Sequence, residues 1–123
     1  MKVFLVEDSL RIREQIRTTV SDAGGKVVGE SAGEADAIAS IADQPPDLVV
    51  VDLQLQEGNG IGVLRKLRQA YPRLPLLVLT NCTREHYGER CLAAGANWFL
   101  EKNSDYPQFE ALIRQLSTQA SSS

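Results

Sequence analysis

Two kinds of apolar pattern alternate along this chain, and their order predicts a doubly wound α/β domain. Short aliphatic runs, of which Leu48–Val51 is the clearest, are typical of strands buried on both faces. Between these runs, apolar residues recur every three or four positions, as they do on one face of a helix. Because strict alternation of strands and helices implies parallel pairing with right-handed crossovers, we expect helices on both faces of one sheet.

The first half of the chain contains three predicted strands and two predicted helices. The strands cover residues 2–6, 26–30 and 47–52. The first helix begins after Ser9, a residue type that caps helix N-termini, and ends at Gly24-Gly25. Its apolar residues follow helical spacing: Ile12, Ile16, Val20 and Ala23. The second helix covers residues 35–42 and is closed by Pro45-Pro46.

The second half continues the same alternation. Its elements are, in order, a helix over 61–71, a strand over 76–79, a helix over 84–94, a strand over 97–100 and a helix over 109–116. Pro72 stops the first of these helices, and Gly95 ends the second. These elements make one domain over residues 1–117. The remaining residues, 118–123, form a Ser-rich tail that we expect to be disordered.

Length, charge and the scarcity of two residue types exclude several functions. The 123 residues fit one domain, and a net charge of −3 argues against direct nucleic-acid binding or a membrane anchor, since both need basic surfaces. Glu7 and Asp8 interrupt the first apolar run too soon for a signal peptide, so we expect a cytoplasmic location. One His and two Cys are too few for a usual zinc site, and we expect Cys82 and Cys91 to be free thiols.

Polar residues stand at the ends of four predicted strands. Five strands in the flavodoxin-like order 2-1-3-4-5 reverse their winding between the first and third strands, and ligands bind at this reversal, beyond the carboxyl ends of the strands. The residues at these ends are Glu7 with Asp8, Asp52, Thr80 with Asn81, and Glu101 with Lys102. We therefore expect carboxylates, a hydroxyl and an ammonium to meet at one edge of the sheet.

This set of groups suits phosphoryl chemistry. Carboxylates packed together repel one another, and a divalent cation relieves the repulsion. Oxygen ligands with open positions suit Mg²⁺, which neutralises charge on a transferring phosphoryl group. Asp52 is the candidate nucleophile, because a carboxylate can form an acyl phosphate. We expect Lys102 to pair with Asp52 or with a phosphoryl oxygen, and Thr80 to donate its hydroxyl to that oxygen.

At these positions the chain resembles the receiver domain of bacterial two-component response regulators, and the resemblance covers almost all of it. The matching pieces are Val6-Glu7-Asp8, Val51-Asp52-Leu53, Gly60, Leu79-Thr80, Ala94-Gly95-Ala96 and Phe99-Leu100-Glu101-Lys102. The resemblance implies that Mg²⁺, or Mn²⁺ in its place, is held by carboxylates and one backbone carbonyl. The implied ligands are Glu7, Asp8, Asp52 and the carbonyl of Gln54.

The resemblance also implies a switch rather than an enzyme acting on outside substrates. Asp52 would be phosphorylated by a sensor histidine kinase or a phosphotransfer protein, and the domain would catalyse only its own phosphorylation and dephosphorylation. Thr80 and Lys102 would sense the phosphoryl group, and Phe99 would be the aromatic switch residue. The surface made by the fourth helix, fifth strand and fifth helix would then bind an effector protein or a second copy of the chain.

Several positions depart from the usual receiver pattern. Asn103 replaces the proline that usually follows the lysine, and we expect a trans Lys102-Asn103 bond because a cis bond to a residue other than proline costs about 3 kcal/mol. Asn81 is larger than the usual Ala or Gly at its position. We therefore expect Asn81 to slow the entry of the phosphodonor or of water, and the resemblance places Gln54 and Cys82 at two positions that vary in the family and tune phosphoryl lifetime.

Two other functions compete with this interpretation. A degenerate receiver would bind partners without being phosphorylated. Asn81 and Asn103 are the only residues that support this hypothesis. A small Mg²⁺-dependent phosphatase with an aspartate nucleophile would need a second Asp two residues after Asp52 as its general acid. Gln54 stands at that position, which argues against turnover.

Overall fold

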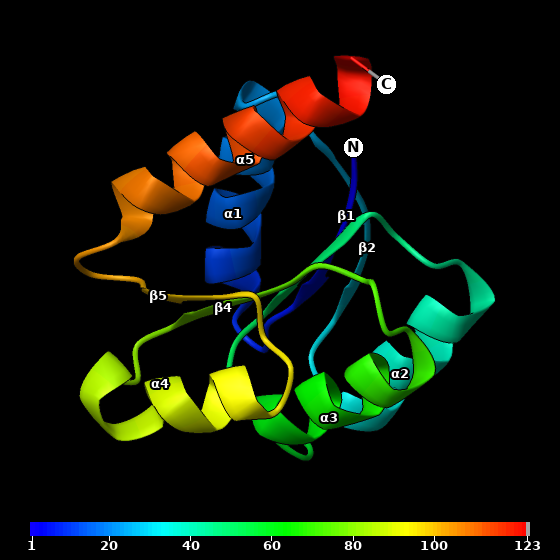
Figure 1. Cartoon of the computed structure of the whole chain (residues 1–123), viewed down its shortest axis with the longest axis vertical. Helices are drawn as coiled ribbons and strands as arrows, with labels where there is room; N and C mark the ends of the chain where they lie inside the picture. The colour runs from blue at the N-terminus through cyan, green and yellow to red at the C-terminus, as the bar shows by residue number, and fades with distance from the viewer. Residues whose placement is uncertain (123) are drawn as a thin grey trace.

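The computed structural model describes residues 1–122, and within them a five-stranded parallel sheet lies between two layers of helices (Figure 1). The strands are β1 (Lys2–Val6), β2 (Lys26–Ser31), β3 (Leu48–Val51), β4 (Leu76–Thr80) and β5 (Trp98–Glu101). Their order in the sheet is β2-β1-β3-β4-β5. The predicted doubly wound fold and its strand order are therefore confirmed.

The helices divide between the two faces of the sheet. On one face lie α1 (Leu10–Asp22) and α5 (Tyr106–Ser122), and on the other lie α2 (Glu34–Asp43), α3 (Gly60–Ala70) and α4 (Arg84–Ala93) (Figure 1). Each face has its own apolar core. All four residues of β3 are buried, with Val49 and Val51 in the core under α2, α3 and α4, and Leu48 and Val50 in the core under α1 and α5. This explains the continuous aliphatic run in β3, since alternate side chains enter opposite cores.

Local signals in the sequence set several helix ends. The Ser9 hydroxyl accepts a hydrogen bond from the Ile12 N–H (3.3 Å) and caps α1, as predicted. The Asn59 side chain caps α3 in the same way, through the Gly62 N–H at 2.9 Å. Gly95, just past α4, has a φ of 115°, a conformation that glycine adopts without the strain of a side chain. Ser9 and Asn59 thus set where the chain enters α1 and α3, and Gly95 sets where it leaves α4 toward β5.

The last helix is longer than the sequence suggested. Although we expected the folded domain to end at residue 117, α5 continues to Ser122, and the Thr118 hydroxyl donates to the Arg114 carbonyl at 2.9 Å. Once a helix is nucleated by packing, each further residue adds one backbone hydrogen bond, so a polar extension can follow a docked helix. The position of the domain boundary stays a prediction, and Ser123 lies outside the described residues.

No helix within residues 1–122 has both the length and the apolar composition that crossing a bilayer requires.

Replacing Gly60 by Ala should destabilise the fold, because α3 starts against the backbone that follows β3. A Cβ atom at Gly60 would lie 2.7 Å from the Leu53 Cα and 2.9 Å from the Asp52 carbonyl carbon. We expect a loss of about 1–3 kcal/mol in the free energy of unfolding, measured by urea denaturation. The control is Gln69→Ala at an exposed position of α3, which should stay within about 0.5 kcal/mol of the parent. Equal stability of the parent and the Gly60 variant would contradict the steric argument.

Candidate functional site

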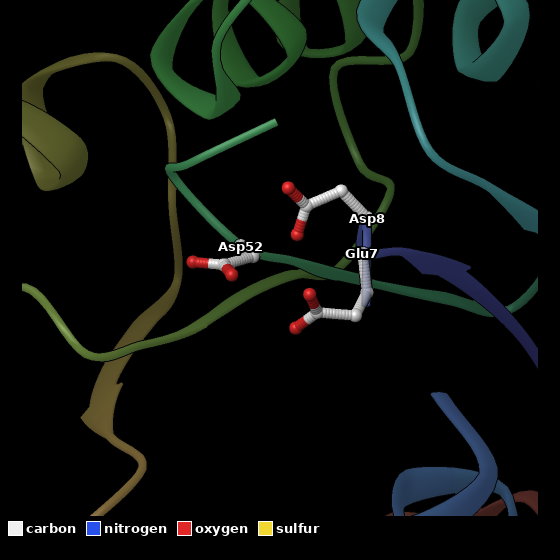
Figure 2. Close-up of side chains that lie close together, drawn as sticks. All are labelled: Glu7, Asp8 and Asp52. Carbon is white, nitrogen blue, oxygen red and sulfur yellow. The ribbon is translucent and has the colours of Figure 1, made fainter. Parts of the chain in front are cut away.

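Three acidic side chains converge beyond the ends of β1 and β3. Because Val6 pairs with Val51, the residues that follow them, Glu7 with Asp8 and Asp52, leave the sheet side by side. One carboxylate oxygen from each of the three lies within 4.8 Å of the others. Figure 2 shows the Glu7 and Asp8 side chains leaving β1 on opposite sides and both directing their carboxylates toward Asp52. The acidic cluster predicted from the sequence is present in the structure.

Burial and charge make this cluster unusual. Glu7 is 2% exposed and Asp52 is 6% exposed, so both carboxylates have lost most of their contact with water. The Lys102 ammonium joins them, with its Nζ 2.6 Å from the Glu7 Oε1 and 3.0 Å from the Asp52 Oδ2. Asp8 is half-buried and has no hydrogen-bond or ion-pair partner among the described residues. One cation thus offsets two of the three acids, and Asp8 remains free to bind a ligand.

The pKa values of the central pair reflect this environment. Burial raises the pKa of Glu7 to about 7, against the smaller lowering effects of the hydrogen bonds from Lys102 and from the Ser9 N–H. Burial also opposes the charged form of Lys102, but the hydrogen bond to Glu7 and the charge of Asp52 outweigh it and hold the pKa of Lys102 above its ordinary value. Lys102 therefore stays charged, while the Glu7 carboxylate is the acid that most readily takes up a proton.

Thr80 and the two residues after it line the end of β4. Thr80 is fully buried, and its hydroxyl accepts a hydrogen bond from the Cys82 N–H at 3.2 Å. Its carbonyl accepts from the Lys102 N–H at 2.8 Å, which ties β4 to the end of β5. Asn81 is exposed and Cys82 is half-buried. The Thr80 hydroxyl thus lies at the predicted edge, where it shapes the turn that leads into α4.

The loop that follows Asp52 is held by groups that the sequence did not single out. The Asp52 Oδ1 accepts a long hydrogen bond from the Gln54 N–H (3.4 Å), and the Gln54 side chain is exposed. Further along, the Glu34 carboxylate at the start of α2 accepts from the Asn59 N–H (3.1 Å) and from the Lys66 Nζ (2.6 Å). The hydrogen bond from Lys66 is the main cause of the lowered pKa of Glu34. Glu34 therefore anchors the loop to α2.

Around Phe99, which the sequence singled out, lie contacts that sequence reasoning missed. Phe99 is buried on the face of the sheet that α4 covers, whereas Trp98 packs against the opposite core, as the alternation along β5 predicts. Arg84, the first residue of α4, donates to the Phe99 carbonyl (3.0 Å) and to the Asp105 Oδ2 (2.7 Å). Asp105 also accepts from the Glu101 N–H (2.9 Å), which is the main cause of its lowered pKa. These contacts connect the start of α4 to β5 and to the turn that leads into α5.

Two further expectations are met. The Lys102-Asn103 bond is trans, and its geometry still lets the Lys102 ammonium reach Asp52. Cys82 and Cys91 are both free thiols. Burial raises the pKa of Cys91 to about 11, which is consistent with an apolar core role for this residue.

The geometry combines a buried aspartate, an all-oxygen acidic cluster and a lysine that counters the charge. Such donors fit Mg²⁺ rather than a soft metal, since the cluster offers no sulfur or imidazole ligand. The site lies where ligands bind in doubly wound folds, beyond the carboxyl ends of β1 and β3. The fold and the site together define a domain suited to phosphoryl chemistry on an aspartate.

Comparisons with known proteins agree with this class. The model of the response regulator receiver domain family matches residues 3–114, so the chain belongs to that family. It is 35% identical over 104 residues to the DNA-binding transcriptional activator DevR/DosR of Mycobacterium tuberculosis, covering 84% of this chain and 48% of that protein. It is 34% identical over 128 residues to the transcriptional regulatory protein PhoP of Escherichia coli, covering 98% and 56%. The chain spans about half the length of the curated relatives it matches.

Solved structures show the same fold. A two-component response regulator of the LuxR family from Aurantimonas matches with a TM-score of 0.87 and 28% identity, over 96% of this chain and 85% of that one. The response regulator domain of Thermotoga maritima CheB matches with a TM-score of 0.83 and 22% identity, over 98% and 95%, and shows the fold alone. The chain is thus a receiver domain of two-component signalling. Domains of this family bind Mg²⁺ through acidic residues, and the Glu7, Asp8 and Asp52 cluster is compatible with such a site.

Replacing Glu7 by Gln should flatten the pH dependence of stability in metal-free buffer. The pKa of Glu7 is raised from 4.5 to about 7 on folding, so between these values the folded chain binds more protons than the unfolded chain. The free energy of unfolding of the parent should therefore fall as the pH rises through about 7, and that fall should be smaller in the variant.

Urea titrations at stepped pH values with a chelator present would measure this difference. Glu14→Gln, an exposed position on α1, is the matched control and should keep the slope of the parent. Parallel curves for the parent and the Glu7 variant would show that Glu7 does not retain its proton in the folded chain.

Proposed function

We propose that Asp52 accepts a phosphoryl group from the phosphohistidine of a sensor kinase or a phosphotransfer protein. The observation that carries this proposal is the contact of the Lys102 ammonium with the Asp52 Oδ2 (3.0 Å), beside the Glu7 and Asp8 carboxylates. An ionised carboxylate is the form that attacks phosphorus, and the ammonium in contact supplies its counter-charge. The Asp52 Oδ1 has only a long backbone contact at 3.4 Å, so this oxygen is the freer of the two.

We propose that Asp8, Glu7 and Asp52, with the backbone carbonyl of Gln54, hold Mg²⁺, for which Mn²⁺ can substitute. Asp8 is the strongest candidate because its carboxylate has no competing partner among the described residues. Glu7 already engages Lys102, so we expect it to contribute mainly charge. Bound Mg²⁺ would neutralise negative charge on the phosphoryl oxygens during transfer.

The transfer is a displacement at phosphorus. A carboxylate oxygen of Asp52 forms a new bond to phosphorus, while the bond from phosphorus to the donor imidazole nitrogen breaks and its electron pair leaves with the imidazole. Lys102 keeps one positive charge next to the reacting carboxylate throughout. The product is an acyl phosphate on Asp52, which water can later hydrolyse. Gln54 follows Asp52, and Asn81 and Cys82 follow Thr80, so we propose that these three residues tune its lifetime.

We further propose that the new charge is passed to the surface formed by α4, β5 and α5. The Thr80 hydroxyl would exchange its bond with the Cys82 N–H for one to a phosphoryl oxygen. Lys102 would shift with it, because its N–H bonds the Thr80 carbonyl. Movement at Thr80 would change the packing of Phe99, and this surface would then bind an effector protein or a second copy of the chain.

The two alternatives have less support from the site. A degenerate receiver would not need an Asp8 carboxylate left without a partner, nor a lysine drawn to Asp52. An aspartate-nucleophile phosphatase needs an acid two residues after Asp52, where the exposed amide of Gln54 stands instead.

Incubation with acetyl phosphate and Mg²⁺ should add one phosphoryl group to the chain, and Asp52→Asn should abolish this gain because an amide cannot form the acyl phosphate. Intact-mass spectrometry measures both. The matched control is Asp43→Asn, an exposed carboxylate at the end of α2, which should gain mass like the parent. No gain in the parent, or an equal gain in the Asp52 variant, would remove the proposal.

Asp8→Asn should weaken Mg²⁺ binding by roughly tenfold or more, since it removes the one acid of the cluster that has no protein partner. Isothermal titration calorimetry with Mg²⁺ would measure the affinity. Asp22→Asn at the far end of α1 serves as the charge-matched control. An affinity of the Asp8 variant equal to that of the parent would show that Asp8 is not a ligand.

A further inference from the structure

Two adjoining hollows lie along the groove between α3 and α4, the helices that share one face of the sheet in Figure 1. One has a volume of about 500 Å³ and the other of about 410 Å³. Arg65 of α3 and Arg90 of α4 line both, so the hollows form one continuous groove. We call this feature the α3–α4 groove.

The α3–α4 groove is positively charged in a chain that is acidic as a whole. Arg68 lines it together with Arg65 and Arg90, and neither hollow has a carboxylate in its wall. None of the three arginines forms an ion pair with a described acidic residue, although the chain carries 16 acidic and 13 basic side chains. Clustering like charges without counter-charges is unfavourable, and an anionic ligand would relieve the repulsion.

The three arginines differ in what holds them. Arg68 has a structural task, because its guanidinium donates to the Gly95 carbonyl (2.7 Å) and the Tyr71 carbonyl (3.0 Å) at the ends of two helices. Neutral carbonyls occupy its donors but leave its charge uncompensated. Arg90 lies over the Tyr87 ring, 5.2 Å from the centroid, which orients its guanidinium beside the groove. Arg65 is exposed and has no hydrogen-bond partner among the described residues. Arg65 and Arg90 are thus available to bind carboxylates.

The wall of the smaller hollow adds an apolar component. Leu53, Ile61 and Tyr87 line it alongside the two arginines, so apolar surface lies next to guanidinium groups. This combination fits a peptide in which carboxylates flank an apolar side chain, since the charges steer and orient the segment and the apolar residue is removed from water. A nucleic acid fits less well, because a phosphate backbone needs an extended basic surface and the chain has a net charge of −3.

We propose that the α3–α4 groove docks an acidic peptide segment of a partner protein, bound by Arg65 and Arg90 around an apolar anchor. The docking requires neither phosphorylation of Asp52 nor a metal ion, although the smaller hollow reaches Gln54 and Cys82, which we proposed above to tune the phosphoryl lifetime.

Fluorescence anisotropy with a short labelled peptide of glutamates around a central Leu-Phe pair tests the docking, with the unphosphorylated chain titrated in low-salt buffer. The Arg65→Ala/Arg90→Ala double variant should bind roughly tenfold more weakly or worse. Arg11→Ala/Lys26→Ala removes the same charge at exposed positions outside the groove and should bind like the parent. Thermal melts would establish that both variants are folded.

Three outcomes would overturn the proposal. The first is equal binding by the parent and the groove variant, and the second is an equal loss in the charge-matched control, which would reveal attraction to net charge alone. The third is equal binding of the same peptide with glutamines in place of glutamates. Competition by a single-stranded oligonucleotide at lower concentrations than the unlabelled peptide would likewise assign the groove to a different class of partner.

Discussion

The Lys102 ammonium, placed between the Glu7 and Asp52 carboxylates, is the interaction on which the candidate site depends. The two acids are 2% and 6% exposed, so burial and mutual repulsion disfavour two adjacent negative charges, and a cation in contact with both offsets part of that cost. Lys102 keeps its charge because both acids stabilise it against its own burial, and its pKa is raised accordingly. The result is a largely dehydrated carboxylate at position 52 that is in direct contact with a cation.

The parallel sheet makes this interaction possible. Adjacent pairing of β1 with β3 brings the acids of two distant segments together, and the return of β5 along β4 brings the lysine to the same edge. The cluster is thus built from strand ends, whose positions are rigid. The chain segments around it are loops and helix starts, held by single side chains such as Glu34 and Arg84. Because loops and helix starts held by few contacts surround the cluster, a change in the charge of the cluster could shift their positions and so alter the surface that they form.

Sequence reasoning recovered the elements and the central cluster but missed the tethers. The strands, the helix caps and the polar residues at the strand ends carry strong local signals, and the topology follows from the order of the elements. The sequence therefore predicted that Glu7, Asp52 and Lys102 lie close together. Glu34 and Arg84 carry no such signal, because an acid at the start of a helix is usually explained by the helix dipole and an exposed base by solvation. Their partners, Asn59 and Asp105, are 25 and 21 residues away, and only the packed structure identifies them. The extension of α5 beyond residue 117 was missed for a related reason, because a helix that is docked by packing can continue through a polar segment that shows no apolar periodicity.

From the sequence alone, apolar periodicity and the order of strands and helices determined the doubly wound fold and the sheet edge at which polar groups gather. These properties are local or follow from topology. Because the hydrophobic effect depends on how much apolar surface is buried and not on exact distances, they do not depend on the precise packing. Only the tertiary structure decided which acid stays unpaired, how deeply Glu7 is buried, and that three arginines from two helices share one groove without a counter-charge. Those properties depend on distances of a few ångströms between segments far apart in the chain, and Coulomb energies and desolvation vary too steeply with such distances for a pattern of residue types to predict them.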